Sequence, residues 1–295
     1  MQHSSDPSAS VSATSFNTEL TTANKDSWPI LSLLTTLKCP AILPGLKSLA
    51  PRLSKESTVV LLHNGMGVHD QLVRDLFVDE KTRPTFILGT TTHGVRTTKE
   101  RFEVVHHEGG KGGEMTFAVV PYSSSPPSDP PESLAQTLSL LKDLSATPLN
   151  PTILKYTDLL PKLLHKVVLN SIVNPLTALL SVPNGSLASS PSALALIHSL
   201  ANEAAQIMAA VQPNLPHLAD PKRIVQDLLS LAAATASNRS SMLQDLDAGR
   251  ETEIDFISGY VVEMGKQVGR ETRVNELVRE LVKARSELGG NEGGG

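Results

Sequence analysis

The spacing of hydrophobic positions changes about halfway along the chain. Before roughly residue 150, short apolar runs alternate with glycine, proline or polar turns, whereas the second half carries long stretches of helical periodicity. The first pattern predicts strands over 30–37, 57–62 and 86–91 and a helix over 41–53. Strands that alternate with helices are typical of an α/β sheet.

Further strand signals follow this alternating part. The runs 102–106 and 115–120 flank a loop that contains G-G-K-G-G at 109–113, a pattern that predicts a β-hairpin. A helix over 133–144 and a last short strand over 148–154 complete this half. The sequence therefore predicts one sheet with parallel and antiparallel parts.

Helical periodicity dominates the second half, in the segments 159–181, 192–211, 221–236, 253–268 and 275–288. The change of pattern places a domain boundary near residues 150–155. We expect four regions: a disordered Ser/Thr-rich tail (1–27), an α/β domain (28–153), an all-helical domain (154–288) and a flexible glycine tail (289–295).

Three polar residues interrupt the apolar segment K-V-V-L-N-S-I-V-N-P-L at four-residue intervals: Lys166, Asn170 and Asn174. Each step of four turns a helix by only about 40°, so their side chains share one stripe of the helix surface. Burying a cation and two amides without partners costs free energy. They therefore either satisfy structural hydrogen bonds or face a polar small molecule.

A second polar cluster is S-N-R-S-S-M-L-Q-D at 237–245, followed by T-E-I-D at 252–255. Ser240 and Ser241 can cap a helix or donate to a carboxylate. Glu253 opens an apolar helical segment, where a carboxylate suits the positive end of the helix dipole. Considered alone, this cluster favours capping over ligand binding.

Taken in order, the two clusters resemble one known family. Lys166, Asn170 and Asn174, then Asn184 in P-N-G, then Ser241 and Glu253, are similar to the motifs of ketopantoate reductase (2-dehydropantoate 2-reductase). The upstream segments are similar to the same family: L-L-T-T-L-K at 33–38, V-V-L-L-H-N-G-M-G at 59–67 and G-T-T-T-H-G-V at 89–95. The resemblance runs from about residue 30 to residue 285.

The resemblance implies a Rossmann-like NAD(P)-binding domain followed by an all-helical domain of the 6-phosphogluconate-dehydrogenase-like type, through which a homodimer could form. It implies NADPH-dependent reduction of 2-dehydropantoate to (R)-pantoate, in pantothenate and coenzyme A biosynthesis. Lys166 would be the general acid, and Glu253 would fix Lys166 and reach the cofactor. The substrate would be held by Lys166, Asn170, Asn174, Asn184 and Ser241, and the cofactor by Lys38, Asn64, Val95 and Glu253.

The chain departs from the family in one respect, because G-x-G-x-x-G occurs nowhere in it. That loop lets the backbone approach the cofactor pyrophosphate at a helix N-terminus, so we expect a truncated cofactor domain. An upstream coding segment left out of this sequence, a degenerate paralogue, or a partner that supplies the missing half would each explain the difference. The alternative functions are a catalytically impaired remnant that acts as a binding or dimerising module, and a reductase of another 2-oxo acid.

Composition narrows the remaining partners. Aromatic residues make up 3% of the chain and the net charge is −4, which argues against a nucleic-acid surface. The single cysteine, Cys39, excludes an internal disulfide, and the histidines form no ligand pattern, so no metal site is predicted. The longest apolar stretch, 167–182, is interrupted by Asn170, Asn174 and Pro175 and predicts no membrane span. Residues 1–27 lack the features of a signal or transit peptide, and we expect a soluble, cytoplasmic protein.

Overall fold

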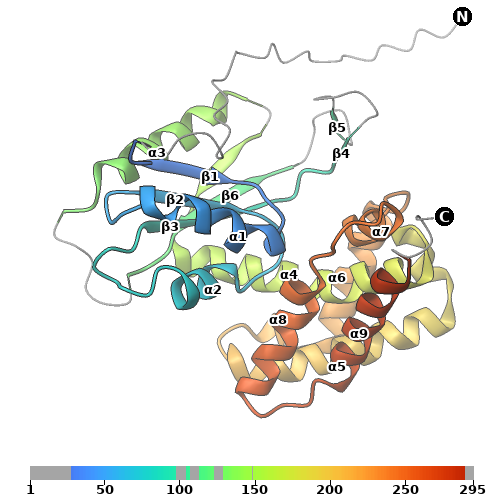
Figure 1. Cartoon of the computed structure of the whole chain (residues 1–295). Helices are drawn as coiled ribbons and strands as arrows, with labels where there is room; N and C mark the ends of the chain where they lie inside the picture. Colours follow the sequence, from blue (N-terminus) through green and yellow to red (C-terminus); the bar gives the residue numbers. More distant parts are fainter. Residues whose placement is uncertain (1–27, 98–103, 107–112, 123–128, 148, 290–295) are drawn as a thin grey trace, which may run out of the picture.

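The protein consists of an α/β sheet domain followed by a helical domain (Figure 1). The computed structural model describes residues 28–97, 104–106, 113–122, 129–147 and 149–289. Within these residues, the strands of the main sheet lie between Ser32 and Ile153, and the helices of the second domain lie between Tyr156 and Gly289. The predicted fold class, a Rossmann-like sheet followed by an all-helical domain, is confirmed.

The main sheet has the strand order β1-β2-β3-β6-β7. β1, β2 and β3 are parallel, β6 runs antiparallel to β3, and β7 is parallel to β6, which confirms the predicted mixture of strand directions. The strand bounds are Ser32–Thr35 (β1), Thr58–Leu62 (β2), Thr85–Thr91 (β3), Met115–Val119 (β6) and Pro151–Ile153 (β7).

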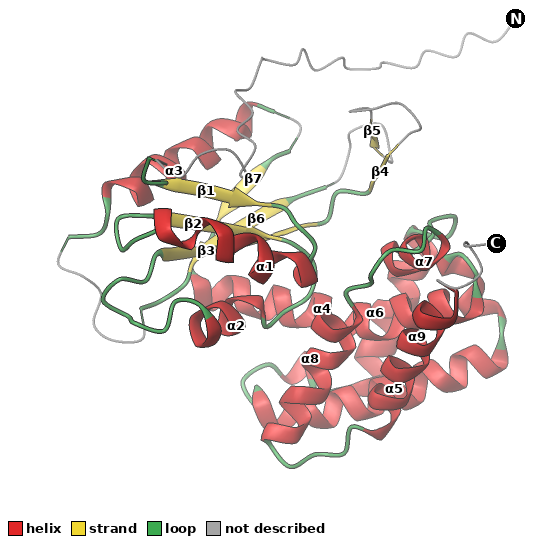
Figure 2. Cartoon of the chain, viewed as in Figure 1, coloured by secondary structure: helices red, strands yellow, loops and turns green. Residues whose placement is uncertain are grey.

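Helices cover both faces of this sheet (Figure 2). α1 (Cys39–Leu49) and α2 (Val68–Asp75) pack on one face, and α3 (Glu132–Asp143) packs on the other. β2 is apolar after Thr58 because alternate residues point to opposite faces of the sheet, and both faces are buried.

The predicted hairpin between 102–106 and 115–120 is wrong. β5 (Val104–His106) pairs with β4 (Val95–Thr97), and β6 pairs with β3. The centre of β6 is buried on both faces, which suits an interior position between two strands. Gly89 accommodates this pairing, because a Cβ there would lie 2.5 Å from the ring of Phe117. The G-G-K-G-G segment lies outside the described residues, apart from Gly113.

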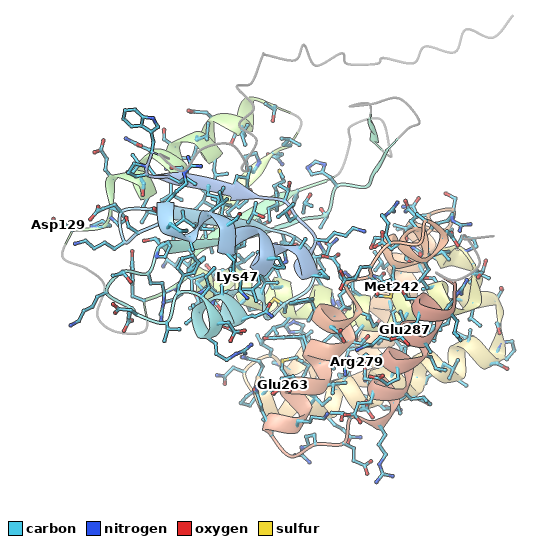
Figure 3. All side chains as sticks on the ribbon, in the orientation of Figure 1. Lys47, Asp129, Met242, Glu263, Arg279 and Glu287 are labelled. Carbon is cyan, nitrogen blue, oxygen red and sulfur yellow. The ribbon has the colours of Figure 1, made fainter. Side chains whose placement is uncertain are left out.

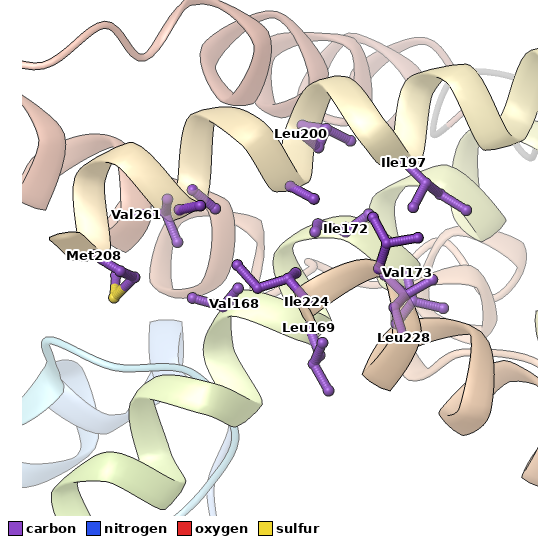
Figure 4. Close-up of a cluster of buried hydrophobic side chains, with 14 of the residues drawn as sticks. Val168, Leu169, Ile172, Val173, Ile197, Leu200, Met208, Ile224, Leu228 and Val261 are labelled. Carbon is purple, nitrogen blue, oxygen red and sulfur yellow. The ribbon is translucent and has the colours of Figure 1, made fainter. Parts of the chain in front are cut away.

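The helical domain is built around its first and longest helix, α4, which packs against most of the others. Figure 4 shows part of the core that α4, α5, α6 and α8 share. The helix bounds are Tyr156–Leu180 (α4), Pro191–Val211 (α5), Pro221–Ala234 (α6), Ser241–Asp247 (α7), Ile254–Gln267 (α8) and Arg273–Gly289 (α9). The two short helices, α2 and α7, were not predicted from the hydrophobic pattern.

α4 continues through Pro175, as in the predicted helix over 159–181, although a proline removes one helical hydrogen bond. Proline has no N–H to donate to the carbonyl four residues earlier, that of Ser171. The Ser258 hydroxyl of α8 donates to this carbonyl instead, at 3.3 Å. The helix therefore stays intact because a neighbouring helix supplies the missing donor.

By length and composition alone, α4 and α5 are each long and apolar enough to cross a membrane. Most of the apolar window of α4, 72%, is instead buried inside the protein, and this helix carries the three polar residues Lys166, Asn170 and Asn174. The apolar character of α4 is thus explained by its central place in the domain core.

The buried carboxylate of Glu203 on α5 anchors the start of α9. It accepts hydrogen bonds from the backbone N–H groups of Val274 and Asn275, both at 2.9 Å, and from Asn275 Nδ2 at 2.7 Å. A negative charge at a helix N-terminus is favourable, because it meets unpaired N–H groups and the positive end of the dipole.

Replacing Glu203 with Gln tests this anchor. The Gln side chain keeps the shape but loses the charge and one acceptor, so we expect Glu203→Gln to lower the free energy of unfolding by about 2 kcal/mol. Denaturant unfolding measures the change. Glu263→Gln on α8, whose exposed carboxylate bonds only to Gln267 within the described residues, is the control and should change the stability by less than about 0.5 kcal/mol (Figure 3). Equal effects of the two substitutions would contradict the anchor.

Candidate active site

The ammonium of Lys166 lies where the two domains meet. Its Nζ donates to Asn64 Oδ1 (2.9 Å), to Thr90 Oγ1 (3.0 Å) and to the Thr91 carbonyl (2.7 Å). These acceptors stand at the carboxyl ends of β2 and β3, the edge where α/β sheets bind ligands. We call the region where the domains meet the domain seam. The sheet domain contributes residues 38–39, 63–67 and 90–91 to it, and the helical domain contributes Lys166, Asp245, Glu253 and Phe256.

Burial changes the acidity of Lys166. Removal from water lowers the pKa of its ammonium from the ordinary 10.5 to about 8. The buried carboxylate of Glu253 acts in the opposite direction and opposes this lowering of the pKa. An amine with a pKa close to physiological pH can both give up a proton and regain it.

Glu253 connects the helical domain to α1. It stands at the N-cap position of α8, but its side chain makes no capping hydrogen bond there. Its Oε1 instead accepts from the backbone N–H of Cys39, at 3.0 Å, where α1 begins. The capping alternative thus holds for Ser240, which accepts from the Leu243 N–H, and not for Glu253.

Cys39 and His63 lie side by side in the domain seam. Cys39 Sγ donates to the Asn64 carbonyl (2.7 Å), and His63 Nδ1, 3.2 Å from Sγ, also donates to that carbonyl (2.7 Å). Burial raises the pKa of the thiol and lowers the pKa of the imidazole, so both groups are neutral. His63 Nε2 has no hydrogen-bond partner among the described residues.

The H-N-G-M-G turn fits closely against α8. Gly65 has φ +78°, and a Cβ there would lie 2.7 Å from the Phe256 carbonyl. The next residue, Met66, donates its backbone N–H to this same carbonyl, at 2.8 Å. Glycine is therefore required at position 65 both by the backbone angle and by the close approach of the helical domain.

Lys38 lies at the same edge, just after β1 and directly before α1. Its ammonium makes an ion pair with the buried Asp245 of α7, which Arg250 also contacts. The Lys38 side chain is 42% exposed, so part of it remains open to a ligand.

The predicted substrate residues differ in how they are paired. Within the described residues, the side chains of Asn170, Asn174 and Ser241 make no hydrogen bond, although Asn174 is buried. The Asn170 and Asn174 amides therefore do not serve as interhelical hydrogen bonds there. Asn184 donates Nδ2 to Thr235 Oγ1 at 2.9 Å, while its buried Oδ1 has no partner in the described part.

Two residues of the G-T-T-T-H-G-V segment, His93 and Val95, have defined partners in the structure. Val95 begins β4 and pairs with His106 of β5. His93 Nε2 lies 2.9 Å from the Leu149 carbonyl, in line with the structural role expected for a histidine at a strand end.

A cavity opens beside the domain seam, between α2, α4 and α8. Its lining includes His63, Asp70, Tyr156 and Tyr260, and Lys166 is not part of it. Burial raises the pKa of Tyr260 to about 12, so its hydroxyl remains protonated at neutral pH.

The seam residues fit one end of a dinucleotide cofactor. A cation (Lys38) and an amide (Asn64) stand at the carboxyl edge of parallel strands, where a nicotinamide ring and its ribose could bind, and the amide contacts Lys166. The pyrophosphate end is different, since the chain has no G-x-G-x-x-G loop to approach it.

Sequence reasoning missed several residues of this seam. Thr90 and Thr91, which hold the Lys166 ammonium, carried a signal in G-T-T-T at the end of a predicted strand. Cys39 and Asp245 carried no such signal, because their partners lie 24 and 207 residues away in the chain.

The buried thiol gives a direct test of how tightly the seam is packed. Cys39 is fully buried and its pKa is raised, so iodoacetamide should alkylate it orders of magnitude more slowly in the native chain than in urea-unfolded chain. Mass spectrometry of the modified fraction over time measures both rates. Similar rates in the two states would contradict the packing described here.

Sequence comparison identifies the family of both domains. Residues 158–286 match "Ketopantoate reductase PanE/ApbA C terminal", and residues 5–121 match "Ketopantoate reductase PanE/ApbA". The chain is 30% identical to 2-dehydropantoate 2-reductase of Yersinia pestis over 272 residues, which cover 91% of this chain and 79% of that protein.

Solved structures share the fold. A probable 2-dehydropantoate 2-reductase from Bacillus subtilis superimposes with a TM-score of 0.62 at 27% identity, covering 92% of this chain and 80% of that one. D-mandelate dehydrogenase, in complex with NADH and anilino(oxo)acetate, gives 0.71 at 21% identity with the same coverage. A dimeric ketopantoate reductase from Staphylococcus aureus gives 0.64 at 14% identity, covering 88% and 80%. The motifs, the two-domain architecture and these matches together establish that the chain belongs to the ketopantoate reductase family of oxidoreductases.

Proposed function

We propose that this chain reduces the 2-oxo group of 2-dehydropantoate to the hydroxyl of (R)-pantoate, with NADPH as the reductant. The observation that carries the proposal is the Lys166 ammonium, held by three acceptors at the carboxyl edge of the sheet with a pKa of about 8. Bound NADPH supplies a hydride to the oxo carbon. The protein must supply the proton and the geometry.

Lys166 is the proposed general acid. Its Nζ gives a proton to the oxygen of the oxo group as negative charge develops there, and the remaining N–H groups stay on acceptors such as Thr90 and Thr91. The lowered pKa makes this transfer easier than from an exposed lysine. Glu253 is the proposed partner that keeps the ammonium charged before the transfer, and its bond to the Cys39 N–H fixes its own position.

Amides and a hydroxyl are the proposed substrate contacts. The Asn170, Asn174 and Ser241 side chains are free of hydrogen bonds in the described part, and the buried Asn184 Oδ1 has an unused acceptor. Groups of this kind bind the hydroxyl and carboxylate of a small polar acid. Asn174 and Asn184 are buried, so their unpaired groups support a ligand-binding role over a purely structural one, whereas the exposed Ser241 can bond to water.

Lys38, Asn64, Val95 and Glu253 are the proposed cofactor contacts. The motif G-x-G-x-x-G does not occur in the sequence, and within the described residues β1 is an edge strand whose Leu34 is 53% exposed. We therefore propose that the cofactor domain is truncated and that this polypeptide alone binds NADPH more weakly than a complete reductase. A homodimer through the helical domain and a cytoplasmic location complete the proposal.

Two alternatives remain distinct from this proposal. A binding or dimerising remnant would show no change of NADPH emission on mixing with the protein at micromolar concentrations. A reductase of another 2-oxo acid would bind NADPH but prefer a different acid from a panel that includes 2-dehydropantoate and an aromatic 2-oxo acid. The structural similarity to D-mandelate dehydrogenase motivates the aromatic member of this panel.

Removing the ammonium tests the role of Lys166. We expect Lys166→Met to lower kcat for NADPH oxidation by about 10²- to 10⁴-fold, because the proton donor and its charge are lost. Lys162→Met, one turn earlier on the exposed face of α4, is the matched control and should leave kcat within about twofold. An unchanged rate in Lys166→Met, with reduction still measurable, would exclude the proposed mechanism.

The pH dependence follows from the same lysine. The general acid must be protonated, so kcat/KM for reduction should be constant below pH 8 and fall as the pH rises through about 8. Since Glu253 raises the pKa of Lys166, Glu253→Gln should move this fall to lower pH. Initial rates across a pH series measure both, and a break that Glu253→Gln leaves in place would argue against this coupling.

A further inference from the structure

Asp245 is a buried carboxylate that joins the two domains. It lies on α7, its side chain is only 4% exposed, and its Oδ1 accepts from the Lys38 ammonium of the sheet domain. Arg250, from the loop after α7, contacts the same oxygen through Nε (3.1 Å) and Nη2 (3.0 Å). A buried carboxylate needs such partners, because burying the charge alone is costly.

A tight turn in the loop after α7 places Arg250 next to Asp245. The Asp245 carbonyl accepts from the N–H of Arg250 at 2.8 Å, and Gly249 between them has φ +62°. Two donors from its own segment therefore already satisfy Asp245 Oδ1. The ion pair with Lys38 comes in addition, from 207 residues earlier in the chain.

Two adjacent residues of the sheet domain are thus held by two carboxylates of the helical domain. Asp245 holds the side chain of Lys38, and Glu253 holds the backbone N–H of Cys39. Both contacts fix the segment that leads from β1 into α1. Among Lys38, Asp245 and Arg250 the charges sum to one net positive. The Lys38 and Arg250 side chains are both part-exposed, at 42% and 55%, and Lys38 is the one that the sheet domain contributes at the seam, where an anionic or hydroxylated ligand can bind.

We propose that Asp245 is a positioning residue for Lys38, holding its ammonium at the domain seam with one N–H on the carboxylate and the others directed to the cofactor. The proposal rests on the function proposed above for the cofactor contact, but the ion pair itself does not. A long lysine side chain loses conformational freedom when it binds a ligand, and a fixed carboxylate removes part of that loss beforehand.

The first test concerns the free protein and needs no cofactor. An amine held in an ion pair is acylated slowly, so a lysine-specific acylating reagent should modify Lys38 several-fold faster in Asp245→Asn than in the native chain. Lys47 is the internal reference and should react equally in both proteins. It is exposed on the last turn of α1, the helix that begins directly after Lys38 (Figure 3). An unchanged ratio of the two lysines would overturn the positioning role.

The second test measures NADPH binding by fluorescence titration. We expect Asp245→Asn to raise the Kd about tenfold, which corresponds to about 1.4 kcal/mol, and Asp245→Glu to recover part of the loss. In a Lys38→Met background, Asp245→Asn should have no further effect, because Asp245 acts through Lys38. Asp247→Asn, two residues along α7 and paired with the surface residue Arg239, is the control and should leave the Kd unchanged.

The outcomes separate the two proposals. If native chain fails to bind NADPH while acylation of Lys38 still accelerates in Asp245→Asn, the proposed cofactor contact fails and the ion pair stands. If NADPH binds and Asp245→Asn binds it equally well or more tightly, or if the losses of Asp245→Asn and Lys38→Met add, Asp245 does not position Lys38.

Discussion

The structure depends on keeping one ammonium charged at a place that disfavours charge. Lys166 is carried by a helix whose neighbouring side chains are apolar, and burial lowers the pKa of its ammonium to about 8. The cation is kept by three oxygen acceptors from the other domain and by the charge of Glu253. The domains must therefore meet at this point, since neither one alone supplies both the lysine and its acceptors.

The remaining contacts of the seam can be understood as consequences of this meeting. Gly65 allows the turn after β2 to approach α8, and the Met66 N–H bonds to the helix at that point. Glu253 reaches past its own helix to the start of α1, and Asp245 does the same with Lys38. Each of these contacts joins a strand end of the sheet domain to the region around α7 and α8, so the carboxyl edge of the sheet and the helical domain form one continuous interface.

The sequence predicted much of this, because the information was local. Periodicity located the buried strands and long helices, and the four-residue spacing placed Lys166, Asn170 and Asn174 on one stripe. Prediction from the sequence failed where the decisive contact joins residues that are far apart in the chain. β6 was paired with the wrong strand because its partner is chosen by burial on both faces and by the space at Gly89, neither of which a turn motif reveals. The predicted helix over 159–181 ran through Pro175, but no local pattern showed that the Ser258 hydroxyl would donate to the carbonyl that the proline leaves without a donor. Asp245 ends the segment S-N-R-S-S-M-L-Q-D, yet no local pattern in the sequence connects it to Lys38.

The pairing of the polar groups also bears on which acid the proposed reaction would use. The buried Asn184 Oδ1 has no donor within the described residues, and the Asn170 and Asn174 amides are likewise unused there. A ligand hydroxyl can donate to such an oxygen, whereas a phenyl ring would leave it unsatisfied. A site built around hydrogen bonds discriminates strongly against a ligand that lacks them, because its own buried groups then remain unpaired. If these residues hold the substrate as proposed, a hydroxylated 2-oxo acid such as 2-dehydropantoate would satisfy their amides better than an aromatic 2-oxo acid would.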